Sequence, residues 1–170
     1  MSDTLREGIQ RGIKAMLAKF TDCPSANILA GYNNKVPLPS DNDYIIFTIM
    51  NPIRLGTPVE KHTSTPAIGT MTSYQDYRVD VQIDFYGDFS FKRANDIMNL
   101  GRTMILCDFL KAYDIQPIEC ENAQNMTSPS GEGEYVKRWM VLLSIDYRDA
   151  VIVSQDCFNT AELNIFETEI

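Results

Sequence analysis

An alternating segment at residues 77–86 constrains the fold of this chain more than any other feature of its sequence. Its order is Tyr-Arg-Val-Asp-Val-Gln-Ile-Asp-Phe-Tyr, so that an apolar side chain stands at every second position from Val79 to Phe85. Successive side chains of a β-strand point to opposite faces of a sheet. The segment therefore predicts a half-buried strand, with one face against a core and the other facing water or a partner.

Other segments have the composition of strands. Residues 44–50 are almost all β-branched or aromatic, which predicts a central strand buried on both faces. Residues 135–147 alternate again and form the longest strand that we expect, and residues 151–153 either continue it or begin another. We expect a short edge strand at residues 115–120, because Pro117 cannot donate a hydrogen bond within a sheet.

Two helices are expected. Residues 3–20 place apolar side chains at one stripe of a 3.6-residue period, and Pro24 follows the last of them. Residues 90–112 have a similar stripe. The order of elements predicts an α+β fold in a single domain, with a mixed or mostly antiparallel sheet and two main helices packed on one face. We assign this domain to residues 1–150, and residues 151–170 to an acidic C-terminal strand or tail.

Residues 54–73 differ in composition from the strands on either side, because small polar side chains predominate in them. The stretch is too long for a tight hairpin loop. It is either an arm that orders against a partner, a mobile surface loop, or the splayed end of a long β-hairpin, and the sequence leaves these open. From the arm hypothesis and from the alternating segment 161–166 we select candidate subunit or partner contacts: Thr57, Lys61, His62, Thr65, Thr70, Tyr74, Leu163, Ile165 and Phe166.

Composition and charge exclude several classes of protein. The chain has 170 residues, of which 44% are hydrophobic, so it can bury a core. Its formal net charge of −8 disfavours a protein that holds a nucleic acid by its phosphates. No run approaches 18 apolar residues, and the polar start of the chain does not resemble a secretory signal. We therefore expect the four cysteines to be reduced thiols.

The sequence contains no assembled catalytic or metal-binding group. His62 is the single histidine and lies in the polar stretch, and the cysteines lack the spacing of a zinc site. Asp41-Asn42-Asp43 resembles the start of a calcium loop, but Ile46 stands where the glycine is needed. Asp80 and Asp84 lie ~13 Å apart on an extended strand, too far for a shared metal. We expect no enzyme activity, no cofactor and no metal.

The charge is unevenly distributed. Residues 1–20 carry a net charge of +2, whereas residues 149–170 carry −5 and contain no lysine or arginine. In a monomer the attraction between these ends is a weak surface effect. In a ring it would help to set the order of neighbouring subunits. The sequence leaves both interpretations open.

Several short segments together resemble the tailed-bacteriophage neck or tail terminator family, whose members lie at the head–tail junction. The resemblance covers about residues 5–150. It rests on Ala30-Gly31-Tyr32, Val36-Pro37-Leu38-Pro39 before the strand 44–50, Gln82-Ile83-Asp84-Phe85-Tyr86-Gly87 before a helix with Arg93-Ala94, and Asp108-Phe109-Leu110.

This resemblance implies a virion structural protein, assembled in the host cytoplasm. It implies a ring, usually of six copies, that caps the tail tube and joins it to the head connector or adaptor protein, with no membrane involved. DNA passes through the lumen of such a ring, and an acidic lumen would repel the phosphates. The alternatives are another head–tail connector or tail-completion component, or a small cytoplasmic enzyme or ligand-binding module.

Overall fold

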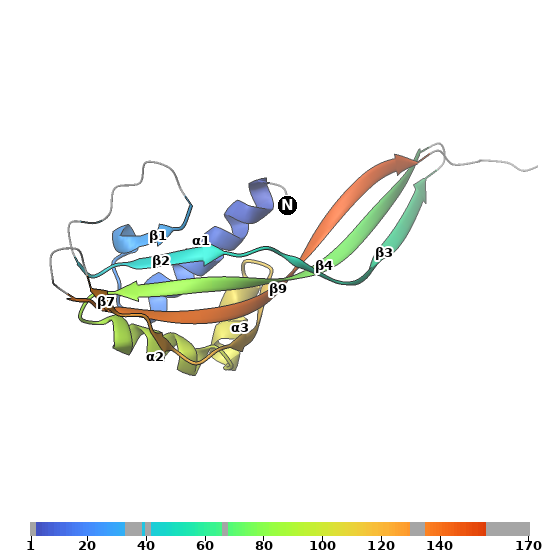
Figure 1. Ribbon diagram of the computed structural model, residues 1–170. Coiled ribbons are helices and arrows are strands. Elements are labelled where there is room, and N and C mark those ends of the chain that lie inside the picture. The colour runs from blue at the N-terminus through green and yellow to red at the C-terminus, as the bar shows by residue number, and fades with distance from the viewer. Residues whose placement is uncertain (1–2, 33–38, 40–41, 66–67, 130–134, 156–170) are drawn as a thin grey trace, which may run out of the picture.

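The computed structural model describes residues 3–32, 39, 42–65, 68–129 and 135–155 of the chain. Its elements are α1 (Asp3–Phe20), η1 (Ser25–Asn27), β1 (Ile28–Ala30), β2 (Ile45–Ile49), β3 (Ile53–Thr65), β4 (Ile68–Tyr86), α2 (Ser90–Leu100), α3 (Met104–Lys111), β5 (Ile115–Cys120), β6 (Gln124–Asn125), β7 (Ser128–Pro129), β8 (Tyr135–Val136) and β9 (Arg138–Gln155). Figure 1 shows two regions, a layered body and a long ribbon that projects from it.

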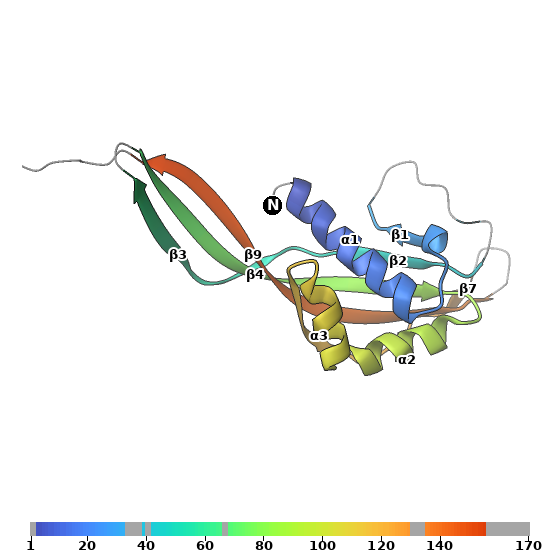
Figure 2. The ribbon, with the colours of Figure 1, turned by 180° about the vertical axis from the view of Figure 1, so that it is seen from behind.

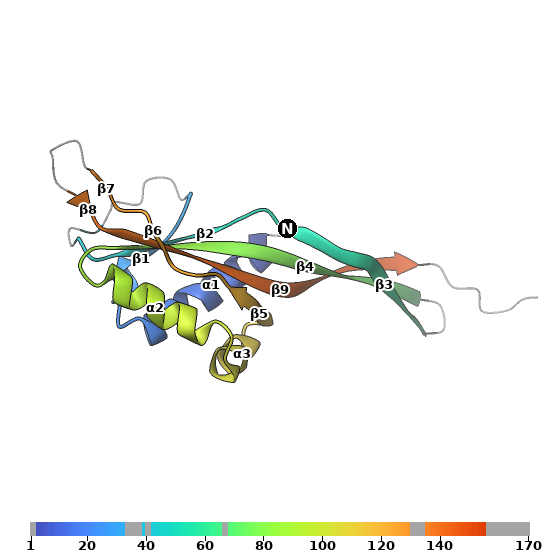
Figure 3. The same cartoon turned by 60° about the horizontal axis from the view of Figure 1, so that its bottom comes forward.

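The sheet confirms the predicted α+β class. Its strand order is β1-β2-β4-β9-β5, with β3 added to the far end of β4 and β6 added to β9. Among the described strands, β1 pairs with β2 in parallel and the other pairings are antiparallel. The helices α1, α2 and α3 all lie on one face of this sheet (Figures 2 and 3). The described residues place no layer on its other face.

The core lies between the helices and the body of the sheet. The predicted stripe of α1 is buried there, since Ile9, Ile13, Met16 and Leu17 are almost completely inaccessible to solvent. The alternation of residues 77–86 is confirmed too, because its apolar positions are buried from Val79 to Phe85. On β9 the facing positions are Val141, Leu143, Ile145 and Tyr147, which are buried as well.

The prediction of one continuous helix at residues 90–112 is wrong, because the chain forms two helices there. The break lies between Leu100 and Met104. Gly101 lies in the break and packs directly on Cys120 of β5, in a space that a larger side chain would not fit. The Thr103 hydroxyl donates to the Leu100 carbonyl at 2.8 Å and closes this turn. Among the described residues, α1 and the two parts of the expected second helix, α2 and α3, thus cover the sheet.

The expectation that residues 44–50 are buried on both faces is also wrong. Ile45 and Phe47 are buried, whereas Ile46, Thr48 and Ile49 are only half-buried. The cause is the layer arrangement, since the helices cover one face of β2 and no described element covers the other. Apolar composition therefore overstated the burial of this strand.

The ribbon resolves two alternatives that the sequence left open. The polar stretch 54–73 belongs to β3 and β4, which form a long β-hairpin. Residues 151–153 continue the preceding strand, because β9 extends to Gln155. The boundary that we assigned after residue 150 falls inside this strand, and residues 156–170 lie outside the described part of the chain. We call residues 53–65, 68–76 and 148–155 the arm, and the remainder the body.

Candidate interaction surface on the arm

The arm is a three-stranded ribbon with β4 in the middle. On one side β3 pairs with β4 from Ile53↔Arg78 to Thr65↔Ile68, and on the other β9 pairs with β4 without a break to Gly69↔Gln155. The pairing of β5 with β9 ends at Ile115↔Tyr147. Beyond this point the outer side of β9 and the outer side of β3 carry no partner strand among the described residues. The arm thus has two open edges (Figure 1).

Hydrogen bonds in the body show which backbone groups of β9 face its open edge. The Leu142 carbonyl accepts from Glu121 N at 2.9 Å, and the Arg138 carbonyl accepts from Met126 N at 2.8 Å. Backbone groups alternate sides along a strand, and the register of β9 against β4 is regular. The even-numbered residues of β9 therefore face outward, which places the free N–H groups of Ile152 and Ser154 on the open edge.

The same argument applies to β3. The Asp80 carbonyl accepts from Met50 N and Tyr86 N donates to the Tyr44 carbonyl, so even-numbered residues of β4 face the side of β2 and β3. Lys61 of β3 pairs with the even-numbered Thr72 of β4. The backbone groups of Lys61 therefore face β4, and those of the even-numbered residues of β3 face away from it. The backbone groups of Glu60, His62 and Ser64 thus line the second open edge.

The arm exposes apolar side chains that no described element covers. Val59, Ile152 and Val151 are 65%, 70% and 59% exposed, and Val153 is exposed next to them. A flat strand edge with exposed β-branched side chains is a ready template for pairing with another chain. Natural proteins protect such an edge unless it is used for assembly. One protection is present here, because the Asp149 carboxylate accepts the outward N–H of Ala150 at 2.9 Å.

A three-residue bulge marks the base of the arm. The register shifts between Leu55 and Val59, so that Gly56, Thr57 and Pro58 lie opposite one residue of β4, Gln75. Gly56 adopts a φ of 65°, which a glycine tolerates without strain. The Gln75 amide donates to the Leu55 carbonyl at 3.0 Å and thereby replaces a missing ladder bond.

Two ion pairs cross from β4 to β9 at this base. Arg148 binds Asp76 through two hydrogen bonds of 2.7 and 2.9 Å, and Arg78 binds Asp146 at 2.8 and 3.0 Å. The hydrogen bond from Arg148 holds the pKa of Asp76 below its ordinary value. The Arg148–Asp76 pair is exposed and the Arg78–Asp146 pair is half-buried. Exposed ion pairs of this kind contribute little to stability, so the main effect of the Arg148–Asp76 pair is on local geometry.

Two cavities flank β9 where its edge becomes open. One, of about 560 Å³, lies toward the helices between α1, the turn after α3 and β9. The other, of about 490 Å³, lies toward the uncovered face of the sheet beside Leu55 and Asp146. Asp114, Tyr147 and Arg148 line both. An extended segment added to this edge would find a space on either side of the strand.

Four of the candidate contact residues lie exposed or half-buried on β3 and β4. Thr57 is in the bulge, and Lys61 is exposed on β3. Thr70 and Tyr74 are half-buried on β4, where the Arg148 guanidinium lies 5.9 Å from the Tyr74 ring. All four lie in the arm, and their contact with another chain stays a prediction.

The remaining candidates are divided. His62 links the two outer strands across β4, since its Nδ1 lies 3.1 Å from Gln155 Oε1. Thr65 pairs with Ile68 through the backbone, and its side chain is outside the description. Outside the described residues altogether are Leu163, Ile165 and Phe166.

The sequence interpretation missed the free edge of β9. Its signal was visible, because Val151, Ile152 and Val153 follow the alternating strand with no glycine or proline between. The sequence alone leaves open whether these residues continue that strand or begin another. Gln75 was missed as well, and its role depends on the bulge opposite, which the sequence alone does not show.

Several polar side chains of the body pair with one another. Asp80 accepts from the Ser144 hydroxyl at 2.6 Å, and buried Asp84 accepts from Arg138 at 3.0 Å. Burial raises the pKa of the Cys120 thiol to about 11. The part of the chain that is described contains no group of three His, Cys, Asp or Glu side chains that could hold a metal ion. No described helix is long and apolar enough to cross a membrane.

An α+β body that carries an arm with two open strand edges defines a protein suited to assembly with other chains. The sequence matches the phage neck terminator protein family over residues 4–169, nearly its whole length, and the chain belongs to this family. It is accordingly a structural protein of the virion neck that assembles with other head and tail proteins. None of the curated proteins matches the chain.

Proposed function

We propose that copies of this protein, six in number, form a closed ring that ends the tail tube and joins it to the head connector. DNA crosses the lumen of this ring. Assembly takes place in the host cytoplasm, before the ring becomes part of the virion. The family supports the place in the particle, and the arm supports the ring.

The direction of the arm strands carries this proposal. Both β3 and β9 are antiparallel to β4, so they run in the same direction, toward the tip, on opposite sides of it. The two open edges of the arm are therefore different surfaces that point away from each other. A contact between unlike surfaces is heterologous, and repeating it by rotation closes a ring.

The charge of the chain supports the passage of DNA. A net charge of −8 per copy repels phosphates, so a lumen lined by this protein would let DNA slide without holding it. We propose further that the acidic residues 151–170 extend the domain formed by residues 1–150 and contribute to contacts between copies.

Native mass spectrometry and electron microscopy of the purified protein test the ring. We expect a particle of six times 19.3 kDa with a central opening. A chain that stays monomeric, even with its tail tube protein present, would contradict the proposal. A variant lacking residues 57–70 should keep a folded body but form no ring, because most of the β3 edge is removed with the candidate contacts of the hairpin.

A further inference from the structure

We propose that the ring is closed by strand pairing, in which the open edge of β9 (residues 148–155) of one copy pairs in parallel with the outer edge of β3 (residues 59–65) of the next copy. This inference rests on the proposed ring. It adds which surfaces meet and how they bind. Repeated around the ring, the pairing would join the arms of all copies into one continuous sheet.

The backbone groups of the two edges are complementary. Ile152 and Ser154 present outward N–H and C=O groups on β9, and Glu60, His62 and Ser64 present them on β3. Both strands run toward the tip of the arm, so rotation about a ring axis brings them together in parallel. Backbone hydrogen bonds of this kind give affinity in strand addition, and pockets beside the strand give specificity.

The register within one arm brings the bulge of one copy to the cavities of the next. Across the three strands, Leu55 is level with Arg148, and Val59 is level with Ala150. The bulge at residues 56–58 is therefore level with Asp149. If the arms run along the ring axis, rotation places the bulge of one copy beside the base of the neighbouring β9 edge, where the two cavities lie.

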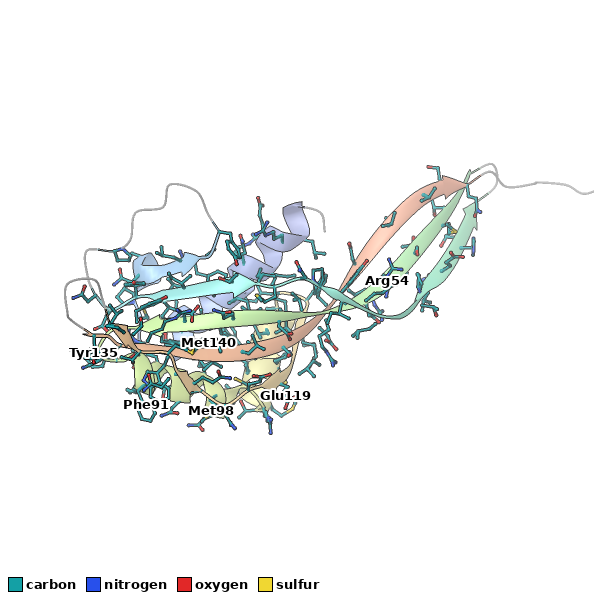
Figure 4. The ribbon with its side chains drawn as sticks, viewed as in Figure 1. Arg54, Phe91, Met98, Glu119, Tyr135 and Met140 are labelled. Carbon is teal, nitrogen blue, oxygen red and sulfur yellow. The ribbon has the colours of Figure 1, made fainter. Side chains whose placement is uncertain are left out.

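Charge supports the same pairing. Arg54 lies near the base of the arm (Figure 4), and neither it nor Lys61 makes an ion pair with any described residue. On the facing edge, the Asp149 carboxylate accepts from the N–H of Ala150 and forms no ion pair with any described residue. When a carbonyl of the neighbouring β3 accepts the Ala150 N–H instead, the Asp149 carboxylate becomes available to pair with Arg54 or Lys61 of that strand. The exposed apolar side chains of β9 lose contact with water in the same step.

Proline substitutions test each edge separately. Ile152→Pro removes an N–H that faces the open edge and leaves the ladder to β4 intact, and His62→Pro does the same on β3. We expect each variant to keep the circular dichroism of the parent chain and to lose the ring at concentrations at which the parent is fully assembled. Ile152→Thr and His62→Gln retain the N–H and should still form rings.

A mixture of the two proline variants gives the sharper result. Each retains the edge that the other lacks, so they should form a one-to-one dimer that cannot grow, which native mass spectrometry detects. If Ile152→Pro fails to fold, Ser154→Pro blocks the same edge and replaces it.

Rings that persist in both proline variants would overturn the strand pairing while leaving the ring itself intact. Loss of the ring in the β9 variant alone would also overturn it, and would point to another occupant of that edge, such as residues 161–166 of a second copy. A parent chain that forms no ring refutes the proposed function instead.

Discussion

The body and the arm share two strands but differ in what surrounds them. In the body, β4 and β9 alternate between a buried face and an open one, and Phe85 is completely inaccessible to solvent. In the arm the same strands continue with their hydrogen bonds unbroken, yet Ile152 is 70% exposed. Backbone pairing therefore extends further than the hydrophobic core does.

This difference assigns separate roles to the two regions. Apolar burial is the main stabilising contribution to folding, and it is confined to the body. The arm has a ladder but no core of its own, so its order depends on being continuous with β4 and β9 of the body. The body should consequently fold without the arm's side chains, while the arm keeps its apolar surface for another chain. Substitutions in the two regions test this separation.

The largest effect is expected in the centre of the body. Phe85→Ala removes a completely buried ring, which costs ~3–5 kcal/mol of unfolding free energy. The matched substitution in the arm, Ile152→Ala, should change it by less than ~0.5 kcal/mol. Urea denaturation of the unassembled chain measures both. Equal losses would mean that the arm has a core within a single copy.

A smaller effect is expected where α2 approaches β5. Gly101→Ala places a methyl group against the Cβ of Cys120, and overpacking of this kind costs ~1–3 kcal/mol. Gly8→Ala is the control, because nothing lies within 4 Å of the added atom and alanine favours a helix by ~0.5–1 kcal/mol. Thermal unfolding should shift in opposite directions for the two. An unchanged midpoint for Gly101→Ala would contradict the close contact.

Alkaline pH should weaken the body through Cys120. Its pKa rises from an ordinary 9.0 to about 11 in the folded chain because the thiol is buried. Below pH 9 both states are protonated, and between these values the unfolded thiol ionises first, so stability falls as pH rises. The contribution is about 1 kcal/mol at pH 10. Burial raises the pKa of Tyr44, Tyr86 and Tyr147 and acts in the same direction.

The Cys120→Ala variant isolates the thiol. Its absolute stability falls because a buried group is lost, but its stability should decline less steeply from pH 9 to 11 than that of the parent. Denaturation midpoints over this range give the two slopes. Parallel slopes would show that Cys120 ionises equally easily in both states.

The contrast between the regions also explains what could be predicted from the sequence. A strand that is buried on one face has apolar side chains at every second position, so the strand at 77–86 was predictable. The stripe of α1 was predictable for the same reason. The alternation at residues 135–147 predicted one strand, which the structure divides into β8 and the beginning of β9. In the arm no described element covers either face of the strands, so the sequence there shows no alternation of apolar and polar residues. The length of the hairpin therefore remained one alternative among three.

Other features depend on contacts between distant segments. The break after Leu100 follows from the approach of Gly101 to Cys120, which are far apart in the chain. The bulge at residues 56–58 is defined by its register against Gln75. The open edges depend on the backbone and on where neighbouring strands end, as β5 ends opposite Tyr147 while β9 continues to Gln155. No residue type in the sequence indicates such an edge. Within the arm, the candidate contacts were thus sought on the polar hairpin at residues 54–73, whereas the free edge of β9 carries exposed apolar side chains.

The smallest effect is expected at the boundary between the regions. Asp76→Asn removes the exposed ion pair with Arg148, and we expect no measurable change in unfolding free energy at neutral pH. The pair is still detectable by titration, because its hydrogen bond lowers the pKa of Asp76 below 3.8. A carboxyl with a lowered pKa stabilises the fold above its ordinary pKa, and that contribution is lost as pH falls through the folded value. Nuclear magnetic resonance titration of Asp76 in the parent and in Arg148→Gln should show the pKa rise toward 3.8 in the variant. An identical pKa of Asp76 in both chains would mean that Arg148 does not hold Asp76 in solution.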